Sequence, residues 1–188
     1  TTIMGAATIK IINKTNMKIR SKMALRYAGV TAILMLVFAS VIYFVSSRDR
    51  EQKFFSDLER EGFSKANLFF EVQTTPEIMH SIYRNNIKYI DEVEVAIYNS
   101  DQELLYHDAK EIDIVKETPE LLTQILESPQ SINFYEGKYQ AVGALFKYHG
   151  NDHIITAAAY DGYGYAKMRK LAANLFVLSV ISIALSFI

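Results

Sequence analysis

Two long runs of apolar residues dominate the hydrophobic pattern of the chain. The first, Leu25 to Val45, has no charged residue after Arg26, and the second, Leu171 to Ile188, has none at all. A helix of about 20 mostly apolar residues is long enough to cross a bilayer. We therefore expect two transmembrane helices with a folded domain between them. The predicted division is an N-terminal segment at 1–23, a first span at 24–45, a domain at 46–170 and a second span at 171–188.

Apolar or small residues continue at intervals of three and four after the first span. They stand at Phe55, Leu58, Gly62, Ala66 and Phe69. Such spacing places them on one stripe of a helix. We expect a long helix that continues out of the membrane, whose stripe pairs with a second copy of the chain, covers the domain's own sheet, or does both.

The rest of the domain combines capped helices with strands. Thr75-Pro76 and Thr118-Pro119 each place a capping hydroxyl before a proline at the first helical position, which predicts helices at 76–83 and 120–127. Alternating and β-branched stretches predict five strands. The expected class is α+β, with a five-stranded antiparallel sheet backed by helices. The predicted strands are 93–98, 104–107, 132–135, 139–148 and 153–160.

The distribution of charge indicates how the chain is oriented in the membrane and which class of partner it disfavours. The basic residues before the first span, such as Lys18 and Arg20, have no acidic neighbour, which places the N-terminus in the cytoplasm and the domain outside it. Residues 46–170 carry 14 basic and 21 acidic residues, and this excess of negative charge disfavours nucleic acid as a partner. There is no cysteine, which excludes disulfides and thiolate metal sites. The apolar end at Ile188 leads us to expect a longer parent protein, and residues 1–16 precede a basic Met17 start that is typical of membrane proteins.

The polar residues reveal no catalytic pattern. His149 and His153 flank a predicted turn at Gly150-Asn151-Asp152, and we expect them to be solvated turn residues that form no metal site. Asp91, Glu92 and Glu94 crowd the start of a strand, where a solvated surface is the expected environment. We therefore assign no catalytic residue and no metal site.

Tyrosines and small residues are the candidates for ligand binding. Gly143, Ala144 and residues 157–159 leave room above the last two strands, which either a cavity or a closely packed helix could fill. Tyrosine rings bury a large area and keep a hydroxyl that can meet a polar ligand. The candidate ligand-binding residues, all on predicted strands, are Tyr98, Tyr106, Tyr135, Tyr139 and Tyr160.

A second candidate site joins the last strand to the second span. Asp161, Gly162 and Gly164 stand there, and glycine adopts backbone angles that other residues avoid. We expect this segment to act as an output joint, where a change in the sheet shifts the membrane helix. An ordinary connection is the alternative.

Several stretches resemble the N-terminal region of bacterial membrane sensor histidine kinases of two-component systems. They are Met17-Lys18-Ile19-Arg20 with the first span, residues 93–98, residues 104–109 and residues 156–165. The resemblance implies a PAS-like or Cache-like sensor domain in the periplasm, anchored by two helices in the inner membrane. It implies a homodimer that senses a small molecule or a protein.

The same resemblance implies an enzymatic core beyond this chain. That core would use ATP and Mg²⁺ to phosphorylate a histidine and would pass the phosphoryl group to a response regulator. The chain itself holds no such machinery and calls for no cofactor of its own. The alternatives are the sensor region of a diguanylate cyclase or a chemoreceptor, and a non-signalling membrane-anchored accessory protein.

Overall fold

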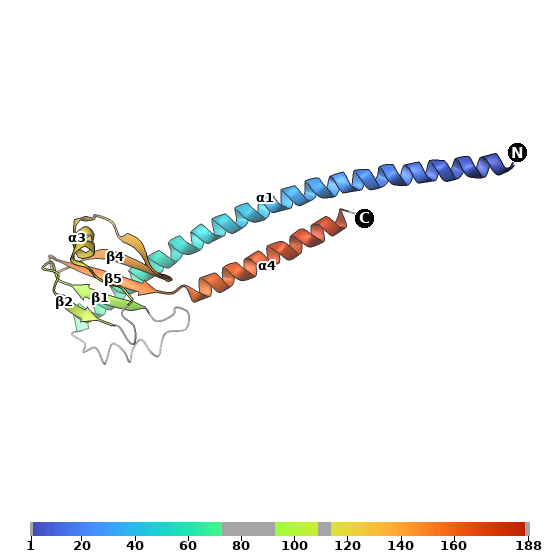
Figure 1. The fold of residues 1–188 in the computed structure, drawn as a ribbon. Helices are drawn as coiled ribbons and strands as arrows, with labels where there is room; N and C mark the ends of the chain where they lie inside the picture. The colour runs from blue at the N-terminus through green and yellow to red at the C-terminus, as the bar shows by residue number, and fades with distance from the viewer. Residues whose placement is uncertain (1, 73–92, 109–113, 187–188) are drawn as a thin grey trace. The chain divides into compact units, whose positions relative to one another are not determined.

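A computed structural model describes residues 2–72, 93–108 and 114–186. The chain divides into a two-helix unit, Thr1–Ser47 with Lys167–Ile188, and a sheet domain, Arg48–Ala166. The helix predicted at 76–83 lies outside the described residues. The described elements (Figure 1) are α1 (Thr2–Val72), β1 (Glu94–Tyr98), β2 (Leu104–His107), α3 (Pro119–Glu127), β3 (Ile132–Glu136), β4 (Tyr139–Tyr148), β5 (Asn151–Ala159) and α4 (Gly162–Leu185).

The sheet has five strands in the order β2-β1-β5-β4-β3, and every neighbouring pair is antiparallel. The predicted α+β class, sheet and long N-terminal helix are therefore confirmed. One turn differs from the prediction, because β5 begins two residues earlier than expected. Tyr148 pairs with Asn151, and the two turn residues His149 and Gly150 both have positive φ, 49° and 84°. This backbone matches the twist of a tight hairpin.

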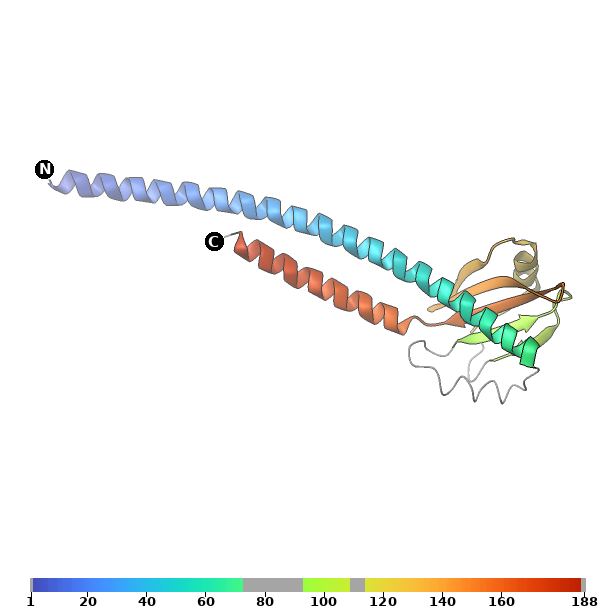
Figure 2. The same ribbon diagram turned by 180° about the vertical axis from the view of Figure 1, so that it is seen from behind.

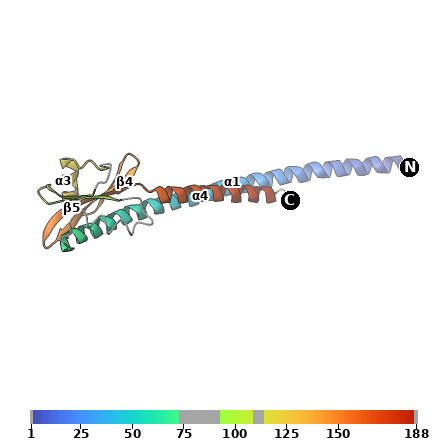
Figure 3. The same ribbon diagram turned by 90° about the horizontal axis from the view of Figure 1, so that it is seen from below.

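The sheet domain is built in three layers. The far end of α1 crosses one face of the sheet, as the view from behind shows (Figure 2), and α3 lies against the other face (Figure 3). Side chains alternate between the two faces along each strand. Ile97 and Ile155 therefore belong to the core beneath α1, whereas the neighbouring Ile154 belongs to the core beneath α3.

The apolar stripe of α1 packs on the domain's own sheet. Leu58 and Ala66 are fully buried, and Phe55 is 7% exposed. At Gly62 the helix comes so close to β5 that an added Cβ would lie 3.1 Å from Ile155 Cγ2. Of the two uses predicted for this stripe, the structure shows the covering of the sheet.

Helix α3 begins and packs through two local devices. Thr118 is its N-cap: the Leu121 amide donates to Thr118 Oγ1 at 3.3 Å, and Pro119 opens the helix, as the sequence predicts. On the inner face, Ile125 occupies the space beside Gly143, where an added Cβ would lie 2.3 Å from Ile125 Cδ1. The room left by this glycine is thus filled by a closely packed helix.

The two-helix unit holds the two apolar runs. Two helices of the described chain are long and apolar enough to cross a membrane. Large side chains stand exposed along both, including Leu36 at 67%, Phe38 at 60% and Phe176 at 70%. Exposed apolar side chains at this density call for an apolar surrounding such as lipid or another helix.

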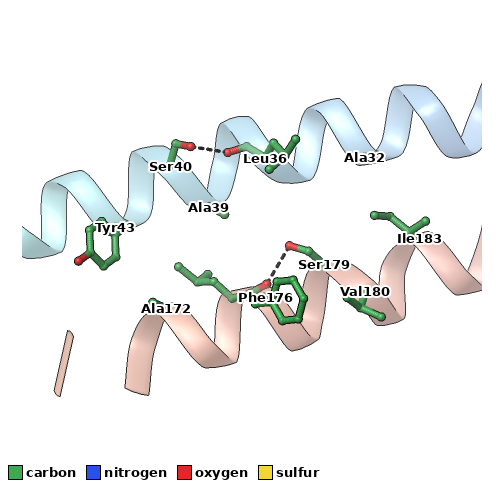
Figure 4. A pocket seen from close by; sticks show the side chains of 11 residues that line it. Ala32, Leu36, Ala39, Ser40, Tyr43, Ala172, Phe176, Ser179, Val180 and Ile183 are labelled. Carbon is green, nitrogen blue, oxygen red and sulfur yellow. Dashed lines mark hydrogen bonds between the residues drawn. The ribbon is translucent and has the colours of Figure 1, made fainter. Parts of the chain in front are cut away.

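A groove of about 440 Å³ runs between these two helices (Figure 4). Its serines offer little polar chemistry, because Ser40 Oγ donates to Leu36 O at 2.7 Å and Ser179 Oγ donates to Leu175 O at 2.8 Å. The groove is therefore an apolar contact surface. Its lining is Ala32, Leu36, Ala39, Ser40, Tyr43, Ala172, Leu175, Phe176, Ser179, Val180 and Ile183.

The contact of α3 with the sheet generates a stability prediction. Gly143→Ala should lower the free energy of unfolding of the domain by about 1–3 kcal/mol, because the new methyl group overlaps Ile125. The measurement is thermal or denaturant unfolding of the full chain in detergent. Adding Ile125→Ala should recover part of the loss that Gly143→Ala causes, and additive losses in the double variant would contradict the proposed overlap.

Candidate functional site

The segment that joins β5 to α4 is organised by Asp161. This residue is 6% exposed and immediately precedes α4. Its carboxylate accepts a hydrogen bond from the Gly164 amide at 2.7 Å, and its carbonyl accepts one from the Tyr165 amide at 3.1 Å. An aspartate that accepts from the third amide of a helix is an N-cap. The connection is thus a capped helix start, and α4 begins at Gly162, within the predicted joint.

The role predicted for the glycines needs correction at Gly164. Its φ lies outside the left-handed region, so the position does not require unusual backbone angles. Glycine is needed there for space: an added Cβ would lie 2.1 Å from Asp161 Oδ2 and 2.4 Å from Oδ1. The carboxylate fills the position that a larger residue would take, because it folds back onto the first turn of the helix.

Arg50 of α1 binds the same carboxylate. Its Nη1 donates to Asp161 Oδ2 at 3.0 Å, with the arginine 14% and the aspartate 6% exposed. The Arg50 guanidinium also lies 4.1 Å from the centre of the Tyr165 ring, within cation–π distance. We call Arg50, Asp161, Gly164 and Tyr165 the clasp. It ties the first turn of α4 to the part of α1 that enters the domain.

A row of aromatic rings extends from the clasp to the β3–β4 turn. Tyr165 stacks on Tyr160 with centroids 5.7 Å apart, and Tyr160 meets Tyr139 edge to face at 6.4 Å. Lys138 Nζ lies 5.3 Å from the Tyr139 ring centre and 5.5 Å from that of Tyr160. Two of the predicted ligand-binding tyrosines therefore lie together, beside the predicted joint.

Tyr135 lies on the α1 side of the sheet. Its hydroxyl donates to a carboxylate oxygen of Glu51, and its ring meets Phe55 edge to face at 5.6 Å. Burial, and then the hydrogen bond and negative charge of Glu51, raise the pKa of Tyr135 to about 12. The phenol is accordingly held as a neutral donor that adds a second link between α1 and the sheet.

The other two predicted tyrosines lie apart from these and from each other. Tyr106 is buried beneath α1, with its ring 5.4 Å from Phe69. Tyr98 packs in the core beneath α3 with Ile154, on the opposite face. The five tyrosines thus form no common lining, because two-residue alternation assigns neighbouring strand positions to different faces.

A second ion pair fastens α1 farther along the sheet. Lys65 is 4% exposed, and its Nζ donates to Asp108 Oδ2 at 2.7 Å and to the Val93 carbonyl at 2.7 Å. Both partners flank the β1–β2 hairpin. A buried ammonium costs solvation unless it is paired and hydrogen-bonded, and here both conditions are met.

On the sheet face away from α1, two carboxylates form hydrogen bonds that link the strands to residues 114–117. Glu94, predicted to be solvated, is instead 5% exposed and accepts from the Ile114 amide at 2.8 Å and the Val115 amide at 3.3 Å. Thr156 Oγ1 donates to Glu117 at 2.6 Å. Glu94 points inward because β1 alternates and is buried on both faces. Asp91 and Glu92 lie outside the described residues.

His153 also differs from its predicted environment. It is the third residue of β5, on the same face as Ile155, so it points toward α1, where it is 8% exposed and its ring lies 4.4 Å from that of Phe70. His149 remains at the turn and lies against Tyr148. Across the described ranges, no three His, Cys, Asp or Glu side chains converge in a way that could hold a metal ion.

Long-range partners were the main feature that the sequence did not reveal. The sequence pattern singles out neither Arg50 nor Lys65. A signal for Lys65 existed, since it lies three residues after Gly62 on the apolar stripe, where an inward cation requires an acidic partner.

Comparison with protein-family models, curated proteins and solved structures gave no match.

The clasp generates a prediction about coupling. Arg50→Gln should destabilise the domain, but in a Gly164→Ala background it should have little further effect, because the added methyl group already displaces the Asp161 carboxylate. The expected coupling is about 1–3 kcal/mol in a double-mutant cycle of unfolding. Arg60→Gln, at an exposed pair on the same helix, is the control and should be additive with Gly164→Ala.

Tyr135 generates a prediction about pH. A phenol whose pKa is raised on folding stabilises the domain fully below pH 10 and loses that contribution as the pH rises toward about 12. Glu51→Gln should lower the pKa of Tyr135, because it removes the carboxylate charge, though burial remains. The measurement is a ring-carbon NMR titration assigned with Tyr135→Phe. Glu59→Gln should leave the titration unchanged, and an unchanged value in Glu51→Gln would refute the proposed cause.

Proposed function

We propose that this chain is the sensing, membrane-spanning region of a two-component sensor histidine kinase. Its sheet domain would lie in the periplasm and would transmit a stimulus to a cytoplasmic kinase core that uses ATP and Mg²⁺. Three features support the proposal: two helices long and apolar enough to span a membrane, one α+β domain between them in sequence, and the stretches that resemble such receptors. A five-stranded antiparallel sheet with a long N-terminal helix also suits a PAS-like or Cache-like sensor.

The observation that carries the proposal is the clasp. A domain that merely sits between two anchors needs no contact between their inner ends. Here one carboxylate caps α4 and binds Arg50 of α1, so the end of β5 cannot move without changing one of these bonds. The contact lies on the shortest covalent route from the sheet to the second apolar helix.

Signalling through this contact would be a choice between two arrangements. Packed interfaces change between discrete states more readily than they deform continuously. A ligand or protein partner shifts such an equilibrium only by its difference in affinity for the two states. In one state Asp161 holds Arg50; in the other the first turn of α4 moves with β5 and this ion pair breaks.

The test uses the full-length product of the gene that encodes this chain, assembled in membrane vesicles and supplied with labelled ATP, or in parallel samples with labelled GTP or a labelled methyl donor. The expected result is an acid-labile phosphohistidine on the protein and transfer to a response regulator. Cyclic diguanylate formation or a methylated signalling rod would instead assign the sensor to the other receptor classes. Absence of every cytoplasmic output would favour the accessory protein and refute the proposal.

The clasp is tested in the same preparation. Arg50→Gln should change the basal phosphorylation rate by about 5-fold or more, the scale of a typical coupling free energy. Arg48→Gln is the matched control, because this exposed arginine on the same helix carries the same charge. Equal effects of the two substitutions would show that charge near the membrane matters and the clasp does not.

A further inference from the structure

The end of the sheet domain that holds the clasp also carries the β3–β4 turn. Arg50 and Asp161, which mark the two helices at this end, are joined at 3.0 Å. Lys138 of the turn is exposed and lies over the rings of Tyr139 and Tyr160, and Tyr160 stacks on Tyr165 of α4. The turn therefore lies beside the start of α4. The residues of this end, Arg50 and Asp161, are also close in sequence to the two apolar runs.

At this end basic residues outnumber acidic ones, whereas the domain as a whole has an excess of acidic residues. Residues 46–170 carry 14 basic and 21 acidic residues, whereas the segments 48–51, 136–139 and 161–170 together carry six basic and four acidic ones. Two of these four carboxylates are engaged, Asp161 by Arg50 and Glu51 by the Tyr135 hydroxyl. The exposed cations are Arg48, Lys138, Lys167, Arg169 and Lys170.

Arg48 and Lys167 lie at the depth of lipid headgroups if the apolar runs span a bilayer. Arg48 follows Val45 by three residues and Lys167 precedes Leu171 by four, which at about 1.5 Å per residue is roughly 5–6 Å along each helix. A headgroup layer is about 5–8 Å thick on each side of the hydrocarbon. Tyr163, 67% exposed on the first turn of α4, is a residue type enriched at this depth.

We propose that this end of the domain rests on the bilayer surface, with Lys138 binding the phosphate groups of phospholipid headgroups. The inference rests on the proposed membrane anchoring. It gives a physical reason for cations on the side of the membrane where the charge rule disfavours them. It also places the β3–β4 turn, which contacts Tyr160 beside the clasp, where membrane charge influences it.

The experiment uses the absence of native cysteine. A single Glu136→Cys, labelled with an environment-sensitive fluorophore, is placed in the full chain in nanodiscs that contain anionic phosphatidylglycerol and a headgroup nitroxide quencher. Quenching should exceed that of an Asn151→Cys label, at the other end of β4 and β5, by about twofold or more. Adding Lys138→Glu, at an exposed position, should reduce it, as should nanodiscs of purely zwitterionic lipid. High salt should also weaken it.

An Ala39→Cys label in the first apolar run tests the membrane anchoring separately from the headgroup contact. Acyl-chain nitroxides should quench it strongly. If they do not, the membrane anchoring itself fails. If they do, the membrane anchoring stands, and the Glu136→Cys label then tests the headgroup contact. The contact is overturned if this label is quenched no more than the Asn151→Cys label. It is also overturned if the quenching changes neither with Lys138→Glu nor with lipid charge.

Discussion

The Asp161 carboxylate is the point on which the arrangement of the sheet domain depends. One oxygen accepts from the first turn of α4 and the other from Arg50, so a single short side chain fixes where β5 ends, where α4 begins and how α1 lies against both. The group is nearly buried, which makes its two partners obligatory, because an ionised carboxylate without them would carry a large solvation cost. Gly164 follows from the same constraint, since only a residue without a side chain leaves the carboxylate its place.

Local chemistry made much of the fold predictable from the sequence. Thr118-Pro119 forms the cap that its pattern indicates, and Ser128 ends that helix before a proline. The alternation of polar and apolar residues predicted β1, a longer apolar stretch predicted β4, and the apolar runs predicted the two long helices. In each case the signal lies within a few residues. The choice between pairing and sheet-covering for the stripe of α1 needed the structure, since both uses have the same periodicity.

What could not be predicted depends on register and on partners far apart in sequence. The β4–β5 turn is two residues shorter than predicted, so that His149 and Gly150 form it and Asn151 and Asp152 pair with β4. Glu94 appears polar and exposed in sequence, yet backbone amides of residues 114 and 115 satisfy it. Arg50 and Asp161 are 111 positions apart, and no local pattern marks them as a pair. The residues predicted to form a joint make the capped start of α4, and Gly164 is required there for space, whereas the sequence predicted a need for unusual backbone angles.

The close approaches on the two sides of the sheet fall at almost the same place. Gly143 pairs with Thr156, and Thr156 lies between Ile155 and Ala157, the two residues against which Gly62 packs. At this spot α1 packs on one face through Gly62, against Ile155 and Ala157, and α3 packs on the other through Ile125, against Gly143. A shift of β5 at Thr156 would therefore alter the contacts of both helices at once, because its neighbours pack against Gly62 and its partner Gly143 packs against Ile125.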